Sequence, residues 1–176
     1  MPAHQELAST TARTIRARTG IETLDGVGVA LVGDLAIVSW TSAATLERVR
    51  WAFDQAEKVR ARNPDGALVL QIIARSSSPP DAVTLKLARE RFAEIGPALR
   101  RMVTVPLGDE FWTAIVRAIT RGVFLFSGHS KRHFVSTREA ALDLLLEGAT
   151  ASTPTRAELE QLIAELQRRV RGPRWA

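Results

Sequence analysis

Three consecutive serines are the residues of this chain whose type and spacing point most directly to chemistry. They stand between an apolar, β-branched run (residues 68–74), typical of a buried strand, and a helical pattern that begins near residue 82. Hydroxyls and backbone N–H groups would then gather at a helix N-terminus, where anions are stabilised. We term this segment the serine loop; it consists of Arg75, Ser76, Ser77, Ser78, Pro79 and Pro80.

Other residue types that support catalysis or metal binding are scarce. Cysteine is absent, which excludes disulfides, thiol catalysis and thiolate metal sites. His129 and His133 are four residues apart, but Ser127-Gly128 before them and a strand pattern after them predict a loop, not a metal-binding helix. The sequence also lacks a phosphate-binding glycine motif and a Gly-x-Ser-x-Gly elbow. We therefore expect no metal, no cofactor and no enzymatic activity.

The charge distribution argues against nucleic acid as a partner. The net charge is +5, but residues 25–147 hold 16 basic and 14 acidic residues, so this central part is nearly balanced. Only residues 168–174 are locally basic, whereas nucleic-acid-binding domains concentrate positive charge on one face. All but three of the 24 basic residues are arginine, which indicates GC-rich codons and a bacterial source.

The elements that must position the serine loop alternate between strands and helices. Apolar runs at 27–32 and 35–40 flank a Gly33-Asp34 turn and predict a β-hairpin, which a helix follows. Three further strands come next, and each leads into an amphipathic helix. These strands span residues 67–74, 100–106 and 132–135. The order ββαβαβαβα, with one more helix at the end, predicts an α/β fold: a mostly parallel sheet with an N-terminal antiparallel hairpin, covered by helices.

The chain divides into one domain and two added segments. At 176 residues and 45% hydrophobic composition, it is long enough for a single core, which we place at residues 25–147. Residues 1–24 are expected to be a polar, disordered extension, and residues 148–176 a linker, an amphipathic helix and a basic tail. The apolar stripe of that helix either packs on the domain or forms a homodimer. It consists of Leu159, Leu162, Ile163, Leu166 and Val170.

Signals for a membrane or for secretion are not recognisable in the sequence. No run approaches the roughly 18 apolar residues of a membrane span. The N-terminus lacks the apolar region of a signal peptide. Because a cysteine-free chain also suits a reducing compartment, we expect a cytoplasmic protein that does not bind membranes.

Three stretches, taken in this order of elements, give the chain a family resemblance. They are the hairpin residues 29–38, the strand with the serine loop at 68–81, and Phe134-Val135-Ser136-Thr137-Arg138-Glu139-Ala140-Ala141. Together they resemble the STAS superfamily, whose best-known members are anti-sigma-factor antagonists. The chain looks closest to the STAS-like branch that borders on the lipid-transfer CRAL-TRIO proteins. The resemblance covers residues 26–147.

The resemblance implies a non-catalytic regulatory module that binds another protein. In this family a phosphorylatable serine follows the central strand, usually after an aspartate; Ser76 occupies that position here, and Arg75 stands in place of the aspartate. A phosphate there would meet unpaired N–H groups, the helix dipole and the Arg75 charge. The serine loop would then be a switch and a partner surface.

Two alternatives remain open at this point. In a purely structural interpretation, Ser78 caps the second helix and Pro79 or Pro80 occupies its first turn. In a second functional interpretation, which the neighbouring superfamily implies, the protein carries a small apolar ligand or lipid. Its pocket would lie between the sheet and helices 82–95 and 111–126. The aromatic residues nearest to it in sequence are Phe92, Trp112, Phe124 and Phe126.

Overall fold

The structure is a computed structural model that describes residues 20–75, 77–124 and 131–171. In these residues it has six strands, five α-helices and a short 3₁₀ helix, η1 (Gly96–Ala98). The strands are β1 (Gly20–Leu24), β2 (Val27–Val32), β3 (Leu35–Trp40), β4 (Ala67–Ala74), β5 (Leu99–Leu107) and β6 (Arg132–Phe134). The helices are α2 (Leu46–Arg62), α3 (Ala82–Ile95), α4 (Glu110–Phe124), α5 (Arg138–Glu147) and α6 (Arg156–Arg171).

The strands form one sheet in which sequence order and spatial order coincide. Strands β1, β2 and β3 are antiparallel neighbours, and β3, β4, β5 and β6 are parallel neighbours. In the register, Val29 lies opposite Val38 on β3, and Val38 lies opposite Gln71 on β4. The α/β class, the antiparallel hairpin and the mostly parallel sheet are therefore confirmed.

Strand β1 is an addition that the sequence pattern did not predict. Residues 20–24 were assigned to a disordered extension, but they pair with β2 from Gly20 opposite Leu31 to Leu24 opposite Val27. The strand lies at an edge of the sheet and has no fully buried residue, and its only apolar side chains are Ile21 and Leu24. Its order comes from pairing with an apolar strand instead of from an apolar pattern of its own.

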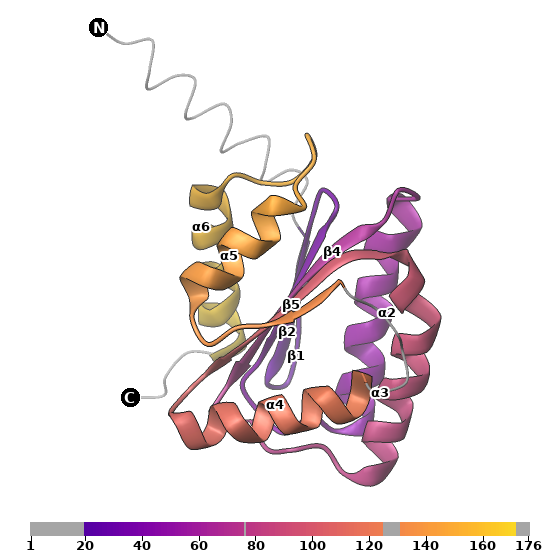
Figure 1. The fold of residues 1–176 in the computed structure, drawn as a ribbon, viewed down its shortest axis with the longest axis vertical. Helices are drawn as coiled ribbons and strands as arrows, with labels where there is room; N and C mark the ends of the chain where they lie inside the picture. The colour runs from indigo at the N-terminus through magenta and orange to yellow at the C-terminus, as the bar shows by residue number, and fades with distance from the viewer. Residues whose placement is uncertain (1–19, 76, 125–130, 172–176) are drawn as a thin grey trace, which may run out of the picture.

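Helices cover both faces of the sheet, as Figure 1 shows: α2, α3 and α4 lie on one side, and α5 and α6 on the other. Right-handed crossovers between adjacent parallel strands place α2, α3 and α4 on the same face. The helices after the last strand cover the opposite face. Successive side chains on a strand point to opposite faces, so the sheet has a core on each face. Val29 and Val38 belong to the first core, beneath α2, and Ala30 and Ile37 belong to the second core, beneath α5 and α6.

The last helix completes the second core. Leu159, Ile163 and Leu166 of α6 are fully buried against the sheet. Gly28 on β2 permits this close packing, because a Cβ atom there would overlap Val170 and come within 2.8 Å of Leu166. The prediction left open whether the stripe packs on the domain or forms a homodimer. The stripe packs on its own domain. Its apolar side chains are therefore already used within one chain and do not form the surface of the suggested homodimer.

We expect Ile163→Ala to lower the free energy of unfolding by about 3 kcal/mol, since it removes buried methyl groups and leaves a cavity in the second core. Gln161→Ala, on the exposed side of the same helix, serves as the control and should change stability by less than about 0.5 kcal/mol. Urea denaturation followed by circular dichroism measures both. Equal stability of the two variants would contradict the packing of α6 on the sheet.

Candidate functional site

The serine loop lies at the carboxyl end of β4, the edge of an open α/β sheet where ligands usually bind. Arg75 joins it to the neighbouring strand: its backbone N–H donates to the Leu107 carbonyl at 2.9 Å, and its guanidinium pairs with Asp109 at 3.1 Å. Both side chains of this ion pair are exposed, so it contributes at most about 1 kcal/mol to stability. Ser76 lies outside the described residues.

The helix after the serine loop begins later than the structural interpretation predicted. The cap of α3 is Asp81, whose carboxylate accepts from the Thr84 N–H at 2.7 Å, so the prediction of a Ser78 cap is wrong. Ser78 and Pro79 each precede a proline, and this position disfavours helical backbone. The helix starts at Ala82, so neither proline occupies its first turn.

The carboxylate of Asp81 also changes the electrostatics expected at this helix end. The backbone hydrogen bond from Thr84 lowers the pKa of Asp81, so this group is negative near neutral pH. A negative charge already occupies the helix N-terminus that was expected to stabilise a phosphate on the serine loop. A phosphate on Ser78 would lie three residues before Asp81 and would be repelled by it.

The two described serines of the loop face different surroundings. Ser77 is buried, with 6% of its surface exposed, and its N–H donates to the Ala74 carbonyl at 3.0 Å. Ser78 is exposed. The loop therefore has an inner side, which includes Ser77 and contributes to the interior, and an outer side that carries Arg75, whereas Ser78 is exposed and also lines the cavity described next.

An apolar cavity of about 130 Å³ lies behind the inner side of the loop. It is bounded by strands β3 and β4, by the serine loop and by helices α2, α3 and α4. Phe92 and Trp112 line it, at the position expected for a carried ligand, whereas the Phe124 side chain and Phe126 lie outside the described residues. Further lining residues are Trp40, Val49, Phe53, Val69, Gln71, Ile73, Ser77, Ala88 and Val116.

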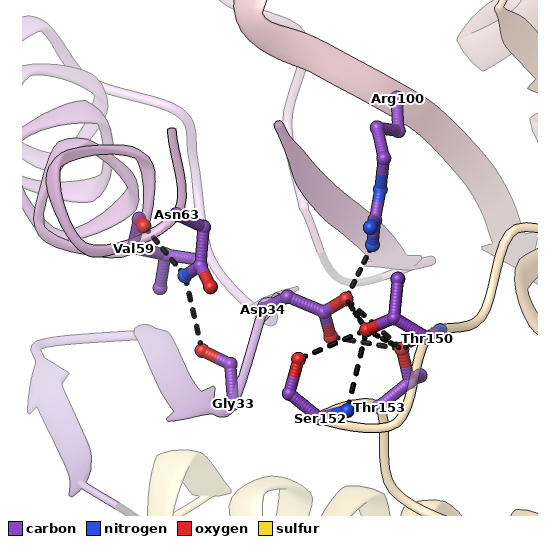
Figure 2. Close-up of polar contacts among 8 residues, drawn as sticks. All are labelled: Gly33, Asp34, Val59, Asn63, Arg100, Thr150, Ser152 and Thr153. Atoms are coloured by element: carbon purple, nitrogen blue, oxygen red, sulfur yellow. Dashed lines mark hydrogen bonds and ion pairs between the residues drawn. The ribbon is translucent and has the colours of Figure 1, made fainter. Parts of the chain in front are cut away.

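A polar cluster around Asp34 lies at the amino-terminal edge of the parallel strands, opposite the edge that carries the serine loop (Figure 2). Asp34, in the turn between β2 and β3, is 2% exposed and pairs with Arg100 at the start of β5. Its carboxylate also accepts hydrogen bonds from Thr150 at 2.8 Å and from Thr153 at 2.9 Å. Asp34 therefore ties the hairpin turn to β5 and to the segment between α5 and α6.

The partners of Asp34 determine its ionisation. Burial by itself would raise the pKa of this carboxyl, but the hydrogen bonds from Arg100, Thr150 and Thr153, together with the Arg100 charge, outweigh burial and lower it. All of these partners are donors that favour the carboxylate form. The cluster thus holds a charged, fully bonded carboxylate, an arrangement that stabilises the fold and leaves no group for proton transfer.

The described residues contain neither a metal-binding cluster nor a membrane-spanning helix. Residues 20–75, 77–124 and 131–171 contain no group of three or more His, Cys, Asp or Glu side chains that could hold a metal ion. His133 lies on β6, half-buried, and His129 falls outside the described part of the chain. Within that part, none of the helices has the length and apolar character needed to cross a bilayer.

Two solved structures resemble this chain in fold. One is an uncharacterised protein of the DUF3478 family with a SpoIIAA-like fold from Shewanella loihica PV-4, 15% identical, with 72% of this chain and 91% of that chain covered at a TM-score of 0.46. The other is the anti-sigma factor antagonist SpoIIAA in its unphosphorylated form, 14% identical, with 71% and 94% covered at a TM-score of 0.41. No protein-family model matches the sequence, and no curated protein does.

One of the two is described as an anti-sigma factor antagonist, and the other as having a SpoIIAA-like fold. At this identity the likeness concerns the fold alone. It assigns this chain no partner, no ligand and no phosphorylated residue.

We expect Asp34→Asn to lower the free energy of unfolding by about 2 to 3 kcal/mol at pH 7, because it leaves Arg100 partly buried without its countercharge. The folded-state pKa of Asp34 lies below its unfolded value of about 3.9. The stabilisation is therefore complete well above pH 4 and is lost as the pH falls through the folded-state pKa.

The difference between wild type and variant should accordingly shrink in acid, as measured by urea denaturation from pH 7 to pH 3. Asp65→Asn, at an exposed turn position, is the control and should leave stability nearly unchanged at every pH. A difference that stays constant down to pH 3 would contradict the assigned role of the Asp34 charge.

Proposed function

We propose that this protein is a non-catalytic regulatory module, acting in the bacterial cytoplasm, that binds another protein through the carboxyl edge of its sheet. The observation that carries the proposal is the position of its exposed apolar side chains. Among the described residues, the large hydrophobic side chains that are exposed are Val83, at 64%, and Phe111, at 75%. Both lie in the first turn of a helix that follows a strand at this edge.

Each of these side chains stands beside a residue of the candidate site. Phe111 stands two residues after Asp109, which caps α4 by accepting from the Trp112 N–H at 2.9 Å and pairs with Arg75 of the serine loop. Val83 stands two residues after Asp81, the cap of α3. Covering a side chain of this size stabilises a complex by about 1.5 to 3 kcal/mol. Apolar contacts flanked by charged residues are typical of a protein interface.

The proposed switch is phosphorylation of the serine loop at Ser76 or Ser78. A phosphate adds a charge of nearly −2 and three strong acceptors. At Ser78 it would compete with Asp109 for the Arg75 guanidinium and repel the Asp81 carboxylate. Either effect changes the charge of the partner surface without changing the core.

We expect the double variant Val83→Ser with Phe111→Ser to lose its partner while keeping the fold. Tagged wild-type and variant proteins, expressed in the native cell, are captured and their bound proteins quantified by mass spectrometry. A partner recovered stoichiometrically with wild type should fall about tenfold or more with the double variant. Gln161→Ser, on the opposite face, is the control and should retain it. Equal recovery by all three proteins would exclude this edge as the interface.

We expect phosphate on Ser76 or Ser78 and none on Ser77, because a kinase needs an accessible hydroxyl and Ser77 is buried. Phosphopeptide mapping of the protein isolated from its own cells gives the position of any phosphate. Replacing Ser76 and Ser78 together by alanine should remove the modification, whereas Ser77→Ala should leave it in place. A phosphate found on Ser77, or on no residue of the loop under any growth condition, would contradict the proposed switch.

A second candidate function is favoured by one observation, the apolar cavity behind the serine loop. Protein interiors are closely packed, and most contain few voids larger than a water molecule. A cavity of about 130 Å³ beside a surface loop is therefore a candidate binding site for a small apolar molecule. In that role the protein would carry or sense a ligand.

A further inference from the structure

The outer side of helix α4 is an exposed face that combines apolar and charged residues. The inner side of the helix is buried through Trp112, Val116 and Val123. The outer side consists of six exposed residues whose spacing places them along one side of the helix. They are Glu110, Phe111, Ala114, Arg117, Ala118 and Arg121. We call these six residues the α4 face.

The apolar half of the α4 face is a strip along the helix. Phe111 is 75% exposed, and the exposed residues Ala114 and Ala118 follow it three and seven positions later. The solvent side of a helix is normally polar. Alanine side chains also let a second helix approach closely, because the distance between packed helices depends on the side chains at the contact. The strip therefore suits packing against another helix.

The charged half of the α4 face separates negative from positive charge along the helix. Glu110 lies in the first turn, whereas Arg117 and Arg121 lie in the second half. No ion pair joins any of these three side chains to another described residue. Arg117 lies over the Phe134 ring, 5.0 Å from its centroid. The α4 face therefore has an acidic end and a basic end.

A second copy of this chain, with its α4 antiparallel to the first, complements both halves at once. Residues that meet in such a pair lie at similar distances on either side of the two-fold axis. Glu110 lies four residues before Ala114, and Arg117 lies three after it. Phe111 lies three residues before Ala114, and Ala118 lies four after it. With the axis beside Ala114, each Glu110 meets the partner's Arg117. Each Phe111 then covers the partner's Ala118, and the opposed helix dipoles attract.

We infer that the α4 face is a dimer interface, which a second copy of this chain occupies with its α4 antiparallel around Ala114. This inference goes beyond the proposed function and does not depend on it. Because one helix face is small for an interface, we expect a weak dimer with a dissociation constant above about 1 µM. The dimer covers Phe111, so a second copy and the proposed partner compete for this side chain.

Sedimentation equilibrium of the purified full chain, in a concentration series that reaches the millimolar range, measures the association. Wild type should form a dimer, and Glu110→Arg should weaken it about tenfold or more, because all charges of the face are then positive. Asp65→Arg, the same change of charge at an exposed turn residue, is the control and should dimerise like wild type. A monomeric wild type, or a Glu110→Arg variant that dimerises equally well, would overturn the inference. Capture from cells tests the proposed function separately.

Mixing two charge variants tests the complementarity directly. The double variant Arg117→Glu with Arg121→Glu has only acidic charges on the α4 face, so it should dimerise as poorly as Glu110→Arg does. An equal mixture of the two should form a heterodimer at least as tight as the wild-type dimer, because every charge then meets its opposite. This recovery would also show that both variants fold. A mixture that associates no better than its components rules out the α4 face.

Single cysteines test the antiparallel orientation, since the chain itself has none. In the dimer the two copies of position 114 meet at the axis, whereas the two copies of position 118 are about 12 Å apart along the helices. Mild oxidation should therefore link the Ala114→Cys variant through a disulfide much faster than the Ala118→Cys variant. Non-reducing electrophoresis follows both reactions. Equal rates, the result for parallel helices, would contradict the antiparallel dimer.

Discussion

The structure depends on one constraint, the sequential order of the parallel strands. Because β3, β4, β5 and β6 are neighbours in both sequence and space, every connection between them crosses in the same right-handed sense. All three crossover helices must then share one face. The other face would be an exposed apolar sheet if the chain ended at β6. Helices α5 and α6 cover this face, so the fold has one core on each face of the sheet.

The same constraint locates the candidate site. The serine loop and the Asp109 cap both follow carboxyl ends of adjacent strands, so they meet at one edge of the sheet. The inner side of the loop closes the cavity between the sheet and the crossover helices, and the outer side lies on the surface. The serine loop therefore borders both the cavity and the proposed partner surface.

The sequence predicted those parts of the fold that rest on local pattern. The hairpin around Gly33, the apolar strand at 67–74 and the order of elements follow from alternation, turn residues and helical spacing. Strand β1 did not, because its order depends on a neighbour and only Ile21 and Leu24 of its residues carry apolar side chains. The helix predicted at 82–95 is confirmed as α3, but the structural interpretation assigned its cap to Ser78, whereas the cap is Asp81; Ser78 and Pro79 each precede a proline, a position that disfavours helical backbone.

Most of the site could not be predicted, because the residues that meet there are far apart in the sequence. The partners of Asp34 are 66, 116 and 119 residues away, so the sequence showed only a turn residue there. The direction in which Ser77 faces depends on the geometry of the loop, and the cavity depends on how well three helices fill the space above the sheet.

The contact of α6 with β2 has a consequence for how the chain folds as it is synthesised. Leu166, which packs near Gly28 of strand β2, emerges from the ribosome almost 140 residues after that glycine. Until then the part of the second apolar face formed by β2 and β3 has no cover from α6. Contacts of such high sequence separation slow folding and leave apolar surface open to association. We therefore expect the nascent chain to expose this apolar surface to association until α6 has been synthesised.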